Sequence, residues 1–237
     1  AGARTKWHDA MEEHFYDPLR EAGVAARREV LDLFTDLMAP AQYDDFVRRF
    51  QNARARSGCV PDLQFNDGGV NRLADVKTVA FNVTNYGGRW LTDVVGPVDR
   101  RARKVHVEYV RNVKKLGRRD DAASEARFVS RLLELTGGET VGLVAGYFGE
   151  FSTAVHQLVK KCAEGIAAAH WEEMGAACES DAVASQKRRL YGEWGVTSQR
   201  EIARIRLGGR AWLGRGIYHP AGAVHAADDA RREAREH

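Results

Sequence analysis

The N-terminal part of the chain spaces its apolar residues as helices do. From 20 to 38 they recur every three or four positions, which predicts a helix that follows an earlier one ended or kinked at Pro18. Pro40 is expected to end this second helix. A third helix is predicted over 41–56, with an apolar stripe that includes Phe46.

Two short apolar runs then flank a glycine-rich turn. The runs cover 59–65 and 70–83, and Asn66-Asp67-Gly68-Gly69 separates them. The second run is partly alternating, with apolar residues at 73, 76, 79, 81 and 83. A turn of this composition between such runs predicts a β-hairpin.

The rest of the chain reads mainly as helices around one more strand. Helices are predicted over 97–116, 120–136, 153–174, 181–194 and 198–213, the last from a capping box of Ser198 and Glu201. The nearly continuous apolar run 141–148 predicts a buried strand.

This order predicts an α/β fold, a small mixed sheet flanked by helices. We divide the chain into a helical lead at 1–56, a core at 57–175, a helical lobe at 176–220 and a charged tail at 221–237.

Composition excludes several classes of protein. The 237 residues carry a net charge of +3, and no apolar run is long enough to span a membrane. Three separated cysteines, Cys59, Cys162 and Cys178, fit neither a disulfide framework nor a zinc site, so we expect an intracellular location, in the nucleus or cytoplasm. The phosphate-loop, Gly-x-Ser-x-Gly and His-Glu-x-x-His motifs are absent from the sequence.

Candidate chemistry lies on the two strands of the predicted hairpin. Asp62 follows a proline on the first strand, and Asp75 and Lys77 stand two apart on the second. Residues two apart on a strand share a face, so Asp75 and Lys77 project together while Val76 points into the core. Two carboxylates, aided by the backbone carbonyl of Val76, are oxygen ligands that suit Mg²⁺ or Mn²⁺.

The predicted helix after the hairpin is strongly basic. Its apolar face includes Val105 and Tyr109. The other face carries positive charge that would suit phosphate groups, and we expect it to bind nucleic acid through Arg101, Lys104, Arg111, Lys114 and Lys115.

The segments VPDL and LADVKTV resemble the motif of the PD-(D/E)xK, or restriction-endonuclease-like, nucleases. The resemblance implies a metal-dependent endonuclease that hydrolyses DNA phosphodiester bonds, with RNA left open as a substrate. Asp62 and Asp75 would bind the metal and Lys77 would position the attacking water. It also implies an acid from a preceding helix, for which Glu29 and Glu21 are candidates.

A narrower resemblance covers roughly 59–158. LADVKT, VDRRARKVHVEYV and GLVAGYFGEFSTAVHQLV are similar to nuclease-type domains that accompany reverse transcriptases in mobile elements of algae and other protists. It implies a part of a longer reverse-transcriptase-containing polypeptide that nicks DNA for insertion. Sequence specificity and oligomeric state are not readable from the sequence.

Structural alternatives exist for each of these features. Asp62 can be a turn or cap residue, Asp75 and Lys77 a solvated pair on an edge strand, and the basic helix a solvated face. His106 and Tyr109 are expected to be structural. Two other functions stay open: a non-catalytic nucleic-acid-binding module on the same scaffold, and a helical protein–protein adaptor.

Overall fold

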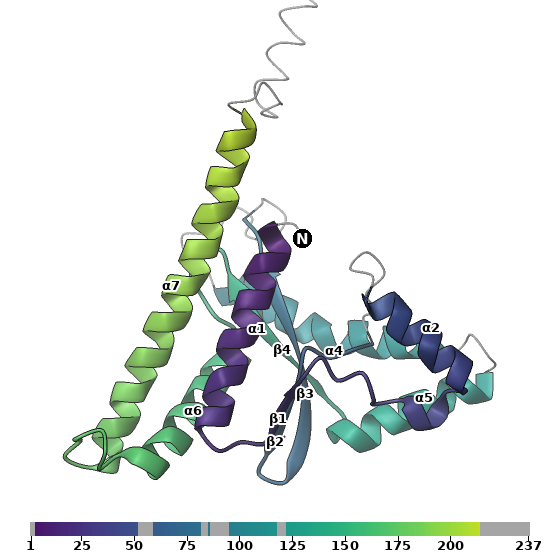
Figure 1. The fold of residues 1–237 in the computed structure, drawn as a ribbon, viewed down its shortest axis with the longest axis horizontal. Coiled ribbons are helices and arrows are strands. Elements are labelled where there is room, and N and C mark those ends of the chain that lie inside the picture. The colour runs from purple at the N-terminus through teal and green to yellow at the C-terminus, as the bar shows by residue number, and fades with distance from the viewer. Residues whose placement is uncertain (1–2, 52–58, 82–84, 86–94, 118–121, 214–237) are drawn as a thin grey trace, which may run out of the picture.

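A mixed four-stranded sheet lies between two groups of helices (Figure 1). The structure is a computed structural model that describes residues 3–51, 59–81, 85, 95–117 and 122–213. The elements, in chain order, are α1 (Ala3–Glu21), β1 (Ala26–Arg28), the short 3-10 helix η1 (Thr35–Leu37), α2 (Pro40–Gln51), β2 (Leu63–Asp67), β3 (Val70–Val79), α4 (Val95–Gly117), α5 (Ala122–Thr136), β4 (Thr140–Gly146), α6 (Thr153–His170) and α7 (Glu179–Leu213). The predicted fold class, an α/β core with a small mixed sheet, is confirmed.

The strands lie in the order β1-β2-β3-β4. β1 with β2 and β2 with β3 are antiparallel pairs, whereas β3 and β4 run parallel. The β2–β3 hairpin turns at Gly68 and Gly69, whose φ angles are 60° and 89°. Positive φ at both central residues is what a tight type I′ turn requires, and glycine adopts it without strain. The predicted hairpin is therefore confirmed.

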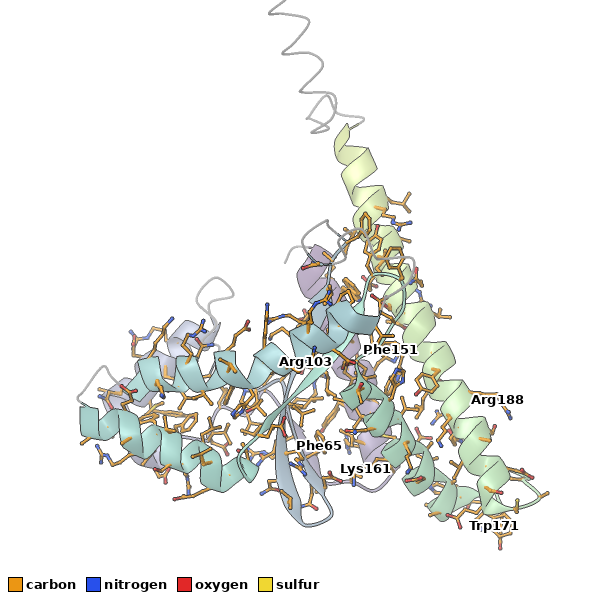
Figure 2. All side chains as sticks on the ribbon, turned by 180° about the vertical axis from the view of Figure 1, so that it is seen from behind. Phe65, Arg103, Phe151, Lys161, Trp171 and Arg188 are labelled. Carbon is orange, nitrogen blue, oxygen red and sulfur yellow. The ribbon has the colours of Figure 1, made fainter. Side chains whose placement is uncertain are left out.

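Alternation along β3 divides the core into two layers. Ala74 and Val76 face a cluster built with α1, α6 and α7, whereas Leu73 faces a second cluster built with α2, α4 and α5. Side chains fill the space on both sides of the sheet, and Phe151 lies in the layer toward α7 (Figure 2). In that layer the Phe15 and Trp194 rings meet edge to face, with centroids 4.8 Å apart, and tie α1 to α7.

The outer edge of β4 is closed by side chains and by the chain that follows it. His106 of α4 accepts a hydrogen bond from the Thr140 N–H at 3.2 Å. The Ser152 hydroxyl accepts from the Val144 N–H at 3.1 Å and donates to the Gly142 carbonyl at 3.2 Å. Gly142 also allows α4 to approach, because a Cβ atom there would lie 2.7 Å from the Ala102 backbone. This edge is thus blocked against pairing with another strand.

The prediction of a helix over 20–38 is wrong. Gly23, at φ 70°, follows α1 as a left-handed cap, and the Val24 N–H bonds the Leu19 carbonyl in a Schellman arrangement. The chain then forms the short edge strand β1. Pro18 lies within the last turn of α1 instead of ending it, and Pro40 begins α2 instead of ending a helix.

The predicted break near Ser198 is also wrong, because α7 is continuous from Glu179 to Leu213. Ser198 and Glu201 are buried inside this helix, on the side that also buries Trp194. Burial against α1 therefore outweighs the local capping signal.

The remaining predicted helices and strands are present among the described residues, and most of their ends are shifted by a few residues. The predicted ends at 56 and 83 lie outside the described residues. The predicted tail at 221–237 lies outside the described residues. In the part of the chain that the structure describes, every helix is too short or too polar to cross a membrane.

Candidate active site

The hairpin register brings Asp62 and Asp75 together. Leu63 pairs with Ala74, so the residue before β2 falls opposite Asp75. An oxygen of the Asp62 carboxylate accepts a hydrogen bond of 2.6 Å from the Val76 N–H. The two aspartates also share a hydrogen bond, which requires a proton on one of them.

Lys77 and Asp75 lie on the same face of β3, as predicted, and form an ion pair. Val76, between them, has a fully buried side chain in the layer toward α1. Backbone groups of successive strand residues point alternately to the two neighbouring strands. The Val76 carbonyl oxygen therefore points to the same side as its N–H, toward Asp62.

The N-terminal helix adds two side chains that the sequence analysis missed. His8 Nε2 lies 3.2 Å from Asp62 Oδ2, and His8 Nδ1 lies 3.3 Å from Asp9 Oδ1. Glu12, one turn further along α1, is 2% exposed and accepts a hydrogen bond of 2.8 Å from Arg28 of β1. We call Asp62, Asp75, Lys77, His8 and Glu12 the candidate site.

The packing of α1 explains why the side chains of His8 and Glu12 lie near the sheet. Trp7, Met11 and Phe15 recur every four residues and are buried in the layer against the sheet. His8 and Glu12 follow Trp7 and Met11 directly, so they lie along the margin of the buried stripe. The spacing of His8 and Glu12, four residues apart beside apolar residues with the same spacing, is visible in the sequence of this helix.

Burial and charge set the protonation of the candidate site. Burial, together with the nearby charge of Asp62, raises the pKa of Asp75 to about 7 despite the attraction of Lys77. Burial also disfavours ionised Asp62, but the hydrogen bond and positive charge of His8 outweigh it and lower its pKa. Burial alone would lower the pKa of His8, and Asp62 instead raises it to about 9. Near neutral pH, His8 is therefore a counter-ion to Asp62.

Neither predicted helix acid belongs to the candidate site. Glu21 ends α1 and forms an ion pair of 2.7 Å with Arg189 of α7. Glu29 is exposed just after β1, with φ 45°, and its N–H bonds the Asp62 carbonyl at 2.9 Å. Glu12 is buried, and burial together with the charge of Asp62 raises the pKa of its carboxyl, although Arg28 opposes the shift.

The basic face of α4 is exposed as predicted. Lys104, Arg111, Lys114 and Lys115 are all exposed there. Arg101 is less available, because it forms an ion pair of 2.6 Å with Glu108.

Tyr109 and His106 are structural, as expected. Tyr109 is buried and donates a hydrogen bond of 2.6 Å to the Cys59 carbonyl. His106 accepts its hydrogen bond from β4.

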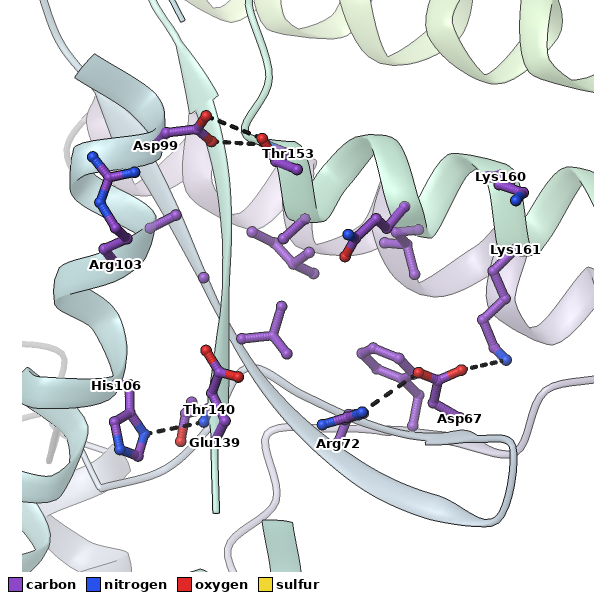
Figure 3. A pocket seen from close by; sticks show the side chains of 18 of the residues that line it. Asp67, Arg72, Asp99, Arg103, His106, Glu139, Thr140, Thr153, Lys160 and Lys161 are labelled. Carbon is purple, nitrogen blue, oxygen red and sulfur yellow. Dashed lines mark hydrogen bonds and ion pairs between the residues drawn. The ribbon is translucent and has the colours of Figure 1, made fainter. Parts of the chain in front are cut away.

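Three cavities border α4 among the described residues, and one of them, about 470 Å³, is lined by α4 side chains alone. The largest, about 780 Å³, lies along β4 between α4 and α6 (Figure 3). Its charges are mixed, and Asp67 stands between Lys161 and Arg72 (Figure 3). The residues that line it do not include the candidate site. The smallest, about 250 Å³, reaches Thr78, the residue after Lys77 on β3, and is lined by Arg100, Arg101 and Lys104 of α4.

The donor set fits a hard divalent cation. Asp62, Asp75 and the Val76 carbonyl offer oxygen atoms, which Mg²⁺ and Mn²⁺ prefer. Among the described residues, His8, Asp9 and Glu12 also bring ligand atoms within 4.8 Å of one another. Comparisons with protein-family models, with curated proteins and with solved structures gave no match for this chain.

Proposed function

We propose that this protein is a metal-dependent endonuclease that hydrolyses DNA phosphodiester bonds. The observation that carries the proposal is the placement of two half-buried carboxylates opposite each other on the β2–β3 hairpin, with a lysine on the same face as one of them. Phosphodiester cleavage uses carboxylates to hold divalent cations and a positive group near the attacking water. The candidate site offers both.

The raised pKa of Asp75 supports a cation at this position. Two aspartates that share a buried site cannot both ionise at low cost, so one holds a proton to about pH 7. A Mg²⁺ or Mn²⁺ ion held by Asp62, Asp75 and the Val76 carbonyl would supply Lewis acidity and an activated water. Glu12, buried beside Asp62, is the residue we assign to the helix acid of this nuclease type.

The other residues have roles that follow from their charge and place. Lys77 orients the attacking water and offsets negative charge that develops on the phosphate, with Asp75 fixing its ammonium group. Protonated His8 holds an oxygen of Asp62 in position. Arg101 and Lys104 line the small cavity beside β3 and bind a neighbouring phosphate.

The expected biological role follows from the sequence resemblance. In a longer polypeptide that also carries a reverse transcriptase, the domain would nick DNA where an element inserts. A single candidate site in each chain suits the cleavage of one strand at a time.

Cleavage of supercoiled plasmid tests the proposal. The unaltered protein is compared with Asp75→Asn and Lys77→Met in Mg²⁺, Mn²⁺ or EDTA. Asp67→Asn is a matched control, since Asp67 lies on the same hairpin but pairs with Lys161 away from the site. The proposal predicts metal-dependent nicking that both site variants lose and the control keeps. Equal nicking by all four proteins would contradict it.

One observation favours a second candidate, a nucleic-acid-binding module without catalysis. His8 lies 3.2 Å from Asp62 and Lys77 contacts Asp75, so side chains of the protein itself already partner both carboxyl groups. Such a module would bind DNA in EDTA with a steep salt dependence and would cleave no substrate in any metal.

A further inference from the structure

Three aromatic side chains gather just beyond the carboxyl ends of β3 and β4. Phe81 follows β3, and Tyr147 and Phe148 follow β4. Their ring centroids are 5.5 Å apart for Phe81 and Tyr147, 5.6 Å for Phe81 and Phe148, and 5.5 Å for Tyr147 and Phe148. We call these three residues the aromatic cluster.

The aromatic cluster keeps a large part of its surface in solvent. Phe81 is 49% exposed and Phe148 is 41% exposed, although each ring already contacts the others. Apolar rings gain stability from burial, so an exposed group of them marks a surface that binds a partner.

A positive charge completes this surface. The guanidinium of Arg206, on α7, lies 4.7 Å from the centroid of the Tyr147 ring and donates a hydrogen bond to the Tyr147 hydroxyl. On the neighbouring helix α4, Arg100, Arg101 and Lys104 line the small cavity that includes Val79, two residues before Phe81. Rings bordered by cations suit a ligand that has both flat bases and phosphates.

The aromatic cluster and the candidate site lie at the same end of the sheet. Phe81 stands four residues beyond Lys77, roughly 13 Å along an extended chain. Antiparallel contacts also align α1 with α7, since Glu21 pairs with Arg189 and His14 bonds Thr197. At about 1.5 Å per residue, Arg206 lies within roughly 5 Å of the level of His8 along these helices.

We propose that the aromatic cluster is a stacking platform for an unpaired nucleobase, so the substrate carries a single-stranded segment next to the cleaved bond. This inference rests on the proposed nuclease function and specifies its class of substrate. Bases inside a duplex are stacked on one another and present only their edges, so rings on a protein surface cannot reach their faces. An unpaired base has a free face, and stacking accepts any base.

Binding in EDTA tests the platform apart from catalysis. The probes are a fluorescein-labelled twelve-nucleotide thymidine strand, the same strand with abasic positions, and a twelve-base-pair blunt hairpin. Phe148→Ala and Phe81→Ala are compared with Phe148→Trp, which keeps an aromatic ring. Leu207→Ala is the matched control, because Leu207 is 64% exposed on α7 and is not part of the aromatic cluster. Circular dichroism verifies folding.

The proposal predicts that each alanine variant binds the thymidine strand about 5- to 100-fold more weakly, as expected for loss of one stacked base. Phe148→Trp and Leu207→Ala should bind the thymidine strand as tightly as the unaltered protein does. All variants should bind the abasic strand with the same affinity. Unchanged affinity in both alanine variants, or equal losses for abasic and thymidine strands, would overturn the proposal. So would the same loss of affinity for the blunt hairpin.

A cleavage assay separates this inference from the proposed function. If the nuclease is active and the platform is real, DNA with a single-stranded flap is cut faster than blunt duplex, and Phe148→Ala removes the difference. Equal rates on both substrates would refute the platform and leave the nuclease standing. Base-dependent binding without cleavage of any substrate would refute the nuclease and leave the platform standing.

Discussion

Replacing Asp75 by asparagine should stabilise the metal-free protein at high pH. The folded state raises the pKa of Asp75 to about 7, above its ordinary 3.8, so folding favours the protonated form. Protonation of Asp75 therefore stabilises the folded protein. This contribution is fully present below pH 3.8, the pKa in the unfolded chain, and is lost as the pH rises through about 7, the pKa in the folded protein. The difference between the two pKa values corresponds to roughly 4 kcal/mol of folding free energy, of which about 2–3 kcal/mol is lost between pH 5 and pH 8.

Urea unfolding in EDTA measures this effect at pH 5 and at pH 8. The stability of Asp75→Asn relative to the unaltered protein should rise by about 2–3 kcal/mol between these two pH values. Asp67→Asn is the control and should show nearly the same difference at both pH values, because the hydrogen bond from Lys161 lowers the pKa of Asp67, which is therefore ionised in the folded and in the unfolded protein throughout this range. A constant difference for Asp75→Asn at both pH values would refute the reasoning about the buried pair.

Three further predictions concern the scaffold and the basic face. Tyr109→Phe removes a buried hydrogen bond to the Cys59 carbonyl and should cost about 1–3 kcal/mol in urea unfolding; an unchanged midpoint would contradict the importance of that bond. Ser152→Ala leaves two groups on the β4 edge without their partner and should cost a similar amount, of about 1–3 kcal/mol, by the same measurement. Lys104→Ala and Lys115→Ala should each reduce the slope of log affinity against log salt by about 1 in EDTA, and an unchanged slope would place DNA elsewhere.

The hairpin and the placement of its charged residues were predictable because local rules determine them. Consecutive glycines select a tight turn, the turn fixes the register, and the register places Asp62 opposite Asp75. The shared face of Asp75 and Lys77 follows from strand periodicity alone. The basic face of α4 was equally visible, since its apolar and charged residues separate at helical spacing.

The missed features depend on contacts between distant parts of the chain. A single strand of three residues, β1, replaced the predicted second helix because Gly23 caps α1 and β2 offers an edge to pair with. His8 and Glu12 already lay on the first predicted helix, but no local rule connected that helix with the hairpin. Spacing along the sequence does not tell which face of α1 meets Asp62, and only the packing of Trp7 and Met11 decides it.

The most direct test of the account is the single-turnover cleavage rate of Lys77→Met compared with that of the unaltered protein, at saturating DNA and Mg²⁺. Lys77 touches Asp75 and stands beside the proposed cation, so its loss should slow cleavage on the order of 100-fold or more. DNA affinity should be nearly unchanged, because the basic face of α4 is intact. Cleavage by Lys77→Met at the rate of the unaltered protein would contradict the assignment of this site.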